Sequence, residues 1–369
     1  MQTAIINENS DTLIIAKKQR IANDLDYLTA LLHARYGKMA VEDRLIELSR
    51  LQSLTELYQT IYPDEEIADI GDFQRLCVFN LASEIYNFRK YLSGPGVSLL
   101  NWILTHFQLE NLKVLLRTFL TGRFLERLDR YIIYLPGELS LDVKNLANAS
   151  TIDDFIYMMP KGIFQDCMNK ALRLYGDYKK PFFFEATLDN AYFSELLRHV
   201  NSLSDKDKES IKSLICQEID IFHLMLIVRG RFIYNLSSDL FKPFHIDGTR
   251  LPKRFFNAMI GDPDILSLAN RIEHRIIDRL PIEFGKTEEG RGADISLLEQ
   301  QAWRRFYRLS NQAFRGSHMG LGAVMGYIGI RRIEIANLIT ISEGIRNNAL
   351  PETTRRRLIT KTDSEVVYV

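Results

Sequence analysis

One pattern of polar and aliphatic residues occurs three times in this chain and constrains its fold more than any other feature. Each copy has a polar residue, Asn or His three positions later, and aliphatic residues at the fourth and seventh positions. This spacing places the four side chains on one face of a helix. The copies are Gln108-Asn111-Leu112-Leu115, Asp220-His223-Leu224-Ile227 and Glu334-Asn337-Leu338-Ile341.

The spacing between the copies predicts an internal triplication. Asn111 and His223 are 112 residues apart, and His223 and Asn337 are 114 residues apart. A repeat of this period indicates three helical units, which could close into a pseudo-threefold ring with a central opening. The predicted units are residues 1–149, 150–259 and 260–369.

Helical periodicity extends over most of the chain. Apolar residues recur at helical spacing over residues 21–61, 73–91 and 99–121. Thr151, Ser204 and Ser296 each precede an acidic residue by three positions, which predicts a helix start. We expect an extended or buried connector at 181–184 and a brief strand-like piece within 244–252. Because strand signals are otherwise sparse, the predicted fold class is all-α.

Composition indicates an ordinary globular protein without a strong overall electrostatic field. Lys and Arg together number 47, as do Asp and Glu, so the chain has no net charge that favours nucleic acid. The three cysteines, Cys77, Cys167 and Cys216, lack metal-site spacing, and we expect them to be reduced and buried. No segment reaches the roughly 18 apolar residues of a membrane helix, and residues 1–20 form a polar lead without the charge pattern of a secretion signal.

Two glycine-rich segments could suggest nucleotide binding, but neither fits a motif. Residues 285–287, Gly-Lys-Thr, lack the glycine that a phosphate-binding loop requires five positions earlier, where Leu280 stands. We therefore expect residues 284–293 to form a surface loop. Gly320, Gly322 and Gly326 do not have dinucleotide-binding spacing, and small residues here favour close packing of helices or backbone approach to a partner. No cofactor site is predicted.

Two histidines are the candidates for a chemical role. His223 lies among apolar residues near Asp220, which favours a hydrogen-bonded core residue over an acid or base. His274 and Asp278 could supply two metal ligands, but no third is evident. The sequence therefore predicts no catalytic and no metal-binding residues.

Basic residues gather at 304–308 and 355–357. Arg304, Arg305 and Arg308 fall near one helical face. A solvated face is the simplest interpretation, and an anionic lipid or an acidic partner is the alternative. Nucleic acid is not an expected partner, because acids balance bases over the chain.

The motif segments resemble the central-stalk subunit of V/A-type rotary ATPases, called C in archaeal and bacterial complexes and d in eukaryotic ones. The resemblance rests on Gly-Tyr-Ile at 326–328 with Glu-Ile-Ala-Asn-Leu at 334–338, on Glu-Asn-Leu-Lys at 110–113, and on the aromatic-rich opening at 27–62. It covers nearly the whole chain. The chain departs from the family pattern at Arg331 and Arg332, where the family has Lys-Glu, and at His223, where it has Asn.

This resemblance implies a non-catalytic subunit shaped as a funnel of three helical units. Such a subunit would cap the membrane proteolipid ring and receive the foot of the central shaft in its cavity. It would transmit torque for ATP-coupled transport of protons or sodium ions, while the chemistry happens in other subunits. Its place would be at the cytoplasmic side of the membrane, held there by partner subunits.

Five motif residues are our candidates for contact with these partners: Asp220, Arg229, Arg331, Arg332 and Glu334. Under this hypothesis, reversing the charge of Arg332 should weaken assembly and leave the isolated subunit folded. Two other hypotheses stay open. One is a helical adaptor unrelated to rotary ATPases, and the other is an α-helical enzyme that uses His223 with Asp220.

Overall fold

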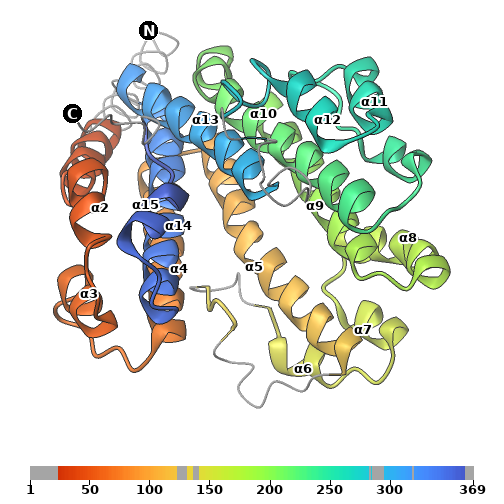
Figure 1. The fold of residues 1–369 in the computed structure, drawn as a ribbon, viewed down its shortest axis with the longest axis horizontal. Coiled ribbons are helices and arrows are strands. Elements are labelled where there is room, and N and C mark those ends of the chain that lie inside the picture. Colours follow the sequence, from red (N-terminus) through yellow and green to blue (C-terminus); the bar gives the residue numbers. More distant parts are fainter. Residues whose placement is uncertain are drawn as a thin grey trace, which may run out of the picture.

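The structure is a computed structural model, and it describes residues 24–122, 131–135, 141–281, 284, 295–317 and 320–361. Within these residues the chain is helical, with a single isolated bridge between Glu273 and Ile277 in place of any strand. The prediction of an all-α fold is therefore confirmed over the described part of the chain (Figure 1).

Six long helices form three consecutive pairs. They are α4 (Ile70–Phe88) with α5 (Pro95–Thr121), α9 (Phe182–Asn201) with α10 (Asp205–Ile227), and α13 (Ile295–Gly316) with α14 (Leu321–Arg346). The second helix of each pair carries one copy of the repeated motif. A π-helical turn, Val228–Ile233, continues α10.

Shorter helices surround these pairs. They are the helix of residues 24–36, α2 (Glu42–Leu48), α3 (Leu54–Ile61), α6 (Val143–Ala147), α7 (Ile152–Met158), α8 (Ile163–Tyr178), α11 (Lys253–Gly261), α12 (Ile265–Ile272) and α15 (Pro351–Arg357). In Figure 1, α2 and α3 lie at one edge of the molecule, and α11 and α12 lie at the opposite edge. Two 3₁₀ turns, Arg89–Tyr91 and Ser238–Phe244, complete the described elements.

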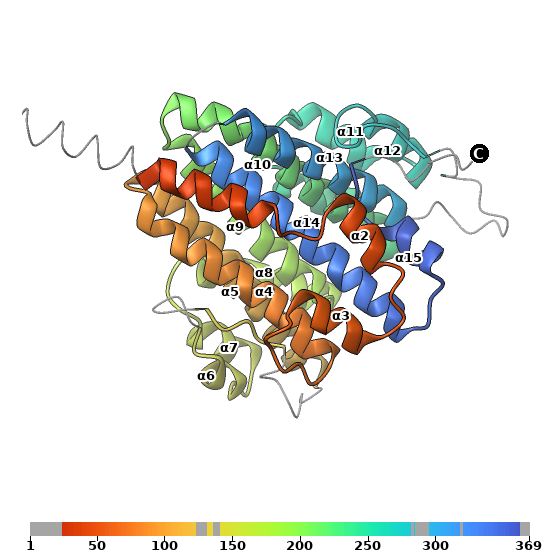
Figure 2. The ribbon, with the colours of Figure 1, turned by 90° about the vertical axis from the view of Figure 1, so that its left-hand side faces the viewer.

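The pairs contact one another in a regular order. The first helix of each pair packs against the motif helix of another pair: α9 against α5, α13 against α10, and α4 against α14. The motif helices α10 and α14 also contact each other directly. Figure 2 shows α14 running alongside α10 and α13, with α4 and α5 next in the stack.

Local signals placed several helix ends correctly. The Thr151 hydroxyl accepts a hydrogen bond from the Asp154 backbone N–H, and the Asp154 carboxylate accepts one from the Thr151 backbone, so the predicted capping box starts α7. Ser204 caps α10 by accepting from the backbone N–H of Asp207. Gly122 ends α5 in the left-handed conformation, with a φ of 62° that glycine adopts without strain.

Several predictions about the connections were wrong. Residues 182–184 are buried, in agreement with one of the two alternatives, but they are not a connector, because Pro181 is the N-cap of α9 and the three phenylalanines are helical. Residues 244–252 contain no strand, and a 3₁₀ turn leads instead into a tight turn at Gly248. Ser296 is not an N-cap, because α13 already begins at Ile295. The long helical region 21–61 is divided into three helices by breaks after residues 36 and 48.

Other expectations fall outside the described residues. These are the polar lead at 1–20, nearly all of the loop at 284–293 with its Gly-Lys-Thr, and the end of the chain after residue 361.

The glycine-rich start of α14 serves close packing against α13. A Cβ atom added to Gly326 would lie 2.4 Å from the backbone nitrogen of Phe314 and 2.6 Å from the carbonyl oxygen of Ser310. Both neighbours are backbone atoms of α13, which cannot rotate away as a side chain would. The interpretation of these glycines as helix-packing residues is therefore confirmed within the chain itself.

We expect Gly326→Ala to destabilise the protein by about 1–3 kcal/mol, because the added methyl group must push two helices apart. Urea unfolding of the purified chain would measure this loss. Gly176→Ala is the matched control, since Gly176 is an exposed position of α8 where an added Cβ meets no atom within 4 Å. That control should be neutral or slightly stabilising, because alanine favours helix over glycine. Equal effects of the two substitutions would contradict the packing argument.

Candidate functional site

The asparagines of the first and third motifs hold an extended segment that follows their helix. Asn111 donates from Nδ2 to the carbonyl oxygen of Ile133 at 2.7 Å and accepts from its N–H at 2.8 Å. Asn337 makes the same two bonds with Ile359, at 2.9 and 2.8 Å. In both cases the partner stands 22 positions after the asparagine, so the two motifs perform the same structural task.

His223 performs the corresponding task in the second motif. Its Nε2 accepts a hydrogen bond of 3.1 Å from the backbone N–H of Ile246, which is 23 positions later. The side chain is fully buried, and this burial lowers its pKa to about 3, with a smaller contribution from the adjacent His245. His223 is therefore neutral, with its proton on Nδ1. The prediction of a hydrogen-bonded core histidine is confirmed.

The carboxylate of Asp220 lies beside this histidine. Its Oδ1 is 4.0 Å from Nδ1 of His223, and its Oδ2 is 3.5 Å from Nε of Arg250. Burial raises the pKa of Asp220 to about 7, although Arg250 acts in the opposite direction. Both side chains of the Asp220–His223 pair are fully buried, which shields them from any substrate in solvent and weakens the enzyme hypothesis.

A second position of the motif brings together ionisable side chains from all three motif helices. The residues five positions before the Asn or His are His106, Glu218 and Arg332. The Arg332 guanidinium donates from Nη1 to Oε1 of Glu218 at 2.6 Å, which links α14 to α10. Burial lowers the pKa of His106 to about 4. Among the nearby charges, Glu110 and Glu218 act to raise this pKa, and Arg332 acts to lower it. A cavity of about 20 Å³, the size of one water molecule, adjoins Glu218 and Arg332.

Aromatic rings complete the surroundings of Arg332. Its guanidinium carbon lies 5.5 Å from the ring centre of Phe306 and 5.8 Å from that of Trp303. Cation–π contacts of this kind add to the ion pair with Glu218.

A further ion pair links α5 to α9. The Lys113 ammonium lies 2.5 Å from Asp189 and 2.9 Å from Glu110. Burial would lower the pKa of Lys113, but these two carboxylates outweigh it and raise the pKa above its usual value. Lys113 is therefore a charged, almost fully buried link between two helix pairs.

The contact between α14 and α4 is also ionic. Nε of Arg331 lies 3.6 Å from Glu84, which also accepts a hydrogen bond of 2.9 Å from the hydroxyl of Tyr327. Arg35 pairs with the same glutamate at 3.0 Å. Glu84 thus contacts three donor side chains, Arg35 from the first helix and Tyr327 and Arg331 from α14.

Glu334 belongs to the same network. One of its carboxylate oxygens accepts from the guanidinium of Arg331, and the other accepts from the backbone N–H of Ala40. The carboxylate is buried and fully engaged within the chain.

The five predicted contact residues are thus placed in different settings. Asp220 and Glu334 are buried, and Arg331 and Arg332 form internal ion pairs. Arg229 is exposed in the π-helical turn after α10. Their contact with a partner stays a prediction.

Several residues of this network were not predicted from the sequence, above all Glu84, Lys113 and Asp189. No local pattern marks Glu84 and Asp189, because their partners lie on other helices. Lys113 pairs with Glu110 on its own helix as well as with Asp189 on α9. Glu218 and His106 could have been found by reading every position of the repeat in parallel with Arg332.

The remaining chemical candidates have structural partners. The Asp278 carboxylate lies 2.6 Å from Arg305 and 2.8 Å from Arg308, so it pairs with these arginines. Among the residues that the structure describes, no three metal-ligating side chains come together, and no helix is both long and apolar enough to span a membrane. Cys77, Cys167 and Cys216 are free and buried, as expected.

Comparison with known proteins agrees with this architecture. The model of the ATP synthase (C/AC39) subunit family matches residues 28–357. The C subunit of the A-type ATP synthase from Methanosphaera stadtmanae is 24% identical over 342 residues, which cover 90% of this chain and 87% of that protein. The corresponding C subunit from Methanobrevibacter smithii is 23% identical over 346 residues, covering 92% and 89%.

The chain belongs to the ATP synthase (C/AC39) subunit family. It is accordingly a non-catalytic subunit of a V/A-type rotary ATPase, a class of ion-transporting complex. The resemblance inferred from the motifs is confirmed.

We expect Arg332→Met to destabilise the isolated chain by about 3 kcal/mol, because it leaves the Glu218 carboxylate buried without its cation. This is the lower end of the usual range, since 27% of the Arg332 side chain is exposed. The double variant Arg332→Met with Glu218→Met should recover most of the loss, because both charges are then gone. Urea unfolding of both single variants and the double variant would measure the coupling, and additive losses would contradict it. This expectation replaces the one from sequence, that Arg332 could be reversed without harm to the isolated subunit.

His223→Asn should cost less stability than His223→Ala, because asparagine fills this position in the other two motifs and can still accept from Ile246 N–H. The alanine variant leaves that buried N–H unpaired, which costs about 1–3 kcal/mol. Urea unfolding of both variants at pH 7 would measure the difference, and equal losses would show that the hydrogen bond contributes nothing.

The natural chain and His223→Asn should differ in the pH dependence of their stability. The pKa of His223 is lower in the folded state than in the unfolded chain, so between about pH 6.5 and pH 3 only the unfolded state binds this proton. Stability of the natural chain should therefore fall as the pH drops below 6.5, by up to about 1.4 kcal/mol per pH unit from this group. His223→Asn should remove that contribution, which unfolding curves at pH 7 and pH 5 would reveal.

Proposed function

We propose that this chain is the central-stalk subunit that connects the rotor shaft to the membrane proteolipid ring and transmits torque between them. The ring and the shaft would belong to the ATPase that this family serves, with ion transport and ATP chemistry in other subunits. Under this proposal the subunit lies at the cytoplasmic side of the membrane and is held there by its partners. The observation that carries the proposal is the family match over most of the chain.

We further propose that the three helix pairs form a pseudo-threefold funnel, with units at 1–149, 150–259 and 260–369. Three observations support it: the order of contacts α5 to α9, α10 to α13 and α14 to α4, the shared backbone bonds of Asn111, His223 and Asn337, and the convergence of the equivalent His106, Glu218 and Arg332. In a closed ring each pair must contact the next, and the last pair must contact the first. The observed contacts have this order.

Transmission of torque requires that the helix pairs keep their register under load. A buried polar link crosses several of the contacts between pairs: Lys113 with Asp189, Arg332 with Glu218, and Arg331 with Glu84. Sliding one helix past another would separate these charges inside the protein, at a cost that apolar packing alone does not impose. We infer that these pairs stiffen the subunit.

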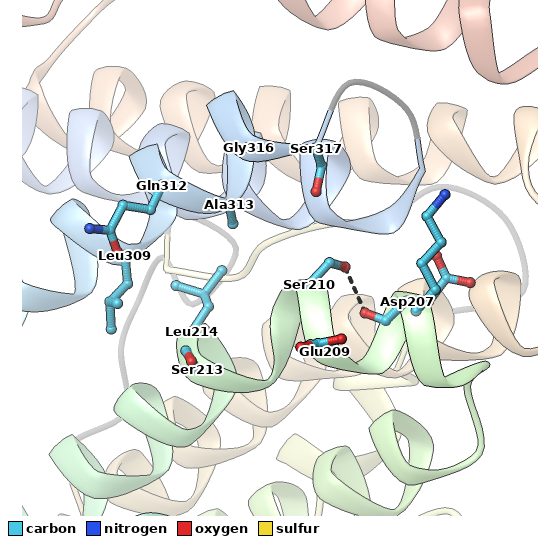
Figure 3. A pocket seen from close by; sticks show the side chains of 11 residues that line it. Asp207, Glu209, Ser210, Ser213, Leu214, Leu309, Gln312, Ala313, Gly316 and Ser317 are labelled. Atoms are coloured by element: carbon cyan, nitrogen blue, oxygen red, sulfur yellow. Dashed lines mark hydrogen bonds between the residues drawn. The ribbon is translucent and has the colours of Figure 1, made fainter.

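A groove between α10 and α13 is our candidate for the surface that receives the shaft. It has a volume of about 580 Å³ and is lined largely by small or polar side chains, including Ser210, Ser213, Ala313 and Gly316 (Figure 3). Small side chains allow a partner's helix to approach closely. Leu214 lines both this groove and the small cavity beside Arg332, so the groove lies next to the centre where the motif helices meet.

Among the five residues expected to contact partners, Arg229 has the exposure that a contact requires. We propose that the other four, Asp220, Arg331, Arg332 and Glu334, act on the interface through the register of α10 and α14.

The test is purification of the tagged chain from its own gently solubilised membranes, with identification of the proteins that accompany it. Recovery of ATPase shaft subunits and the proteolipid would support the proposal. Recovery of the chain alone, from cells shown to contain an assembled rotary ATPase, would contradict the proposed stalk function and favour a role as a helical adaptor.

A substitution in the groove tests the shaft-binding surface separately. Ser213→Trp should abolish recovery of the shaft subunits, because the indole fills the groove, and should leave the isolated chain folded, because Ser213 is exposed. Lys212→Trp is the control on the neighbouring exposed position, which does not line the groove. Equal recovery of the shaft with both variants would place the shaft elsewhere.

A further inference from the structure

A basic pocket lies where residues 274–279 meet α13 and the end of the described chain. Its volume is about 430 Å³. Among the described residues, four cationic side chains and one carboxylate, that of Asp278, line it. The cationic residues are Arg279, Arg304, Arg308 and Lys361. They come from three segments that are distant in the sequence.

The local ion pairs leave this pocket with surplus positive charge. Asp278 is neutralised by Arg308 at 2.8 Å and by Arg305 at 2.6 Å, and Arg305 is not among the lining residues. Burial alone would raise the pKa of Asp278, but these two guanidinium groups outweigh it and hold the pKa below its usual value. Lys361 pairs with Glu42 at 3.0 Å, so within the described part of the chain four lining cations lie beside two carboxylates, Asp278 and Glu42.

A buried glutamine fixes two walls of the pocket. Gln217 has no exposed surface and donates from Nε2 to the carbonyl oxygens of Ile276 at 2.8 Å and Ala302 at 3.1 Å. It thereby holds the 274–279 turn against α13. These two hydrogen bonds fix the backbone near Arg279 and near Arg304, so the two arginines are held on a defined framework.

The third wall is held by the last motif. Asn337 binds both backbone groups of Ile359, and Gln300 donates to the carbonyl oxygen of Leu358 at 3.0 Å. Lys361 stands two positions after Ile359, so these bonds hold it at the rim of the pocket.

We propose that this pocket binds a phosphate-bearing anion, either a free oligophosphate or the headgroup of an anionic phospholipid. Arginine guanidinium groups match the oxygens of a phosphate in pairs, and the volume falls within the range of small-molecule sites. The site is separate from the residues proposed to contact the shaft and does not depend on that function.

The first arm of the test is titration of the full chain with inorganic pyrophosphate by calorimetry. We expect binding that weakens as salt is added. The double variant Arg279→Gln with Lys361→Gln should bind about tenfold more weakly or worse, because two exposed cations are lost without disturbing the core. The control is Lys253→Gln with Arg254→Gln, which makes the same change in charge at exposed positions of α11 outside the pocket. It should bind within about twofold of the natural chain, since neither side chain lines the pocket.

The second arm is flotation with vesicles of phosphatidylcholine, with and without phosphatidic acid. Flotation that requires phosphatidic acid, is lost in the pocket variant and is displaced by pyrophosphate would identify a lipid headgroup as the ligand. Pyrophosphate binding without such flotation would identify a free phosphate compound. Absence of both, or equal binding by the pocket variant and the natural chain, would overturn the proposal.

Discussion

Hydrogen bonds from the motif side chains to the backbone determine the path of the chain beyond the long helices. After each long motif helix the chain reaches a residue outside regular helical bonding, Ile133, Ile246 or Ile359, whose N–H and carbonyl groups need partners when buried. Asn111 and Asn337 satisfy both groups of one residue with a single side chain, which an amide can do because it both donates and accepts. His223 satisfies the N–H alone. These bonds fix where the chain goes after each motif helix.

Charge pairing then determines how the helix pairs sit against one another. Apolar surfaces alone would tolerate some sliding between helices, because dispersion and burial have little directionality. Glu84, Lys113 and Arg332 each need a partner of opposite charge at short range, and each finds it on another helix pair. Such pairs add little net stability compared with an apolar core, but they penalise other arrangements. That property suits the proposed role in torque transmission.

The sequence predicted what depends on local spacing and missed what depends on distant partners. The motif copies, the all-α class, the Thr151 box and the Ser204 cap follow from periodicity and short-range hydrogen bonds, and each is confirmed in the described residues. The phenylalanines at 182–184 were expected to form an extended or buried connector. They are instead the first turn of α9, which tertiary packing buries. Glu84 could not be recognised, because its partners Arg35 and Arg331 are far away along the chain.

The same reasoning explains why perturbed groups here do not indicate catalysis. Shifted pKa values often mark active sites, where a group must exchange protons with a substrate. His223 and Asp220 are shifted because they are buried, and their contacts are backbone groups and neighbouring side chains. A base that is enclosed and already accepts a backbone hydrogen bond has no free lone pair to offer a substrate. The pKa shift of His223 therefore reports its burial in the core, and the side chain serves to hold the backbone of Ile246.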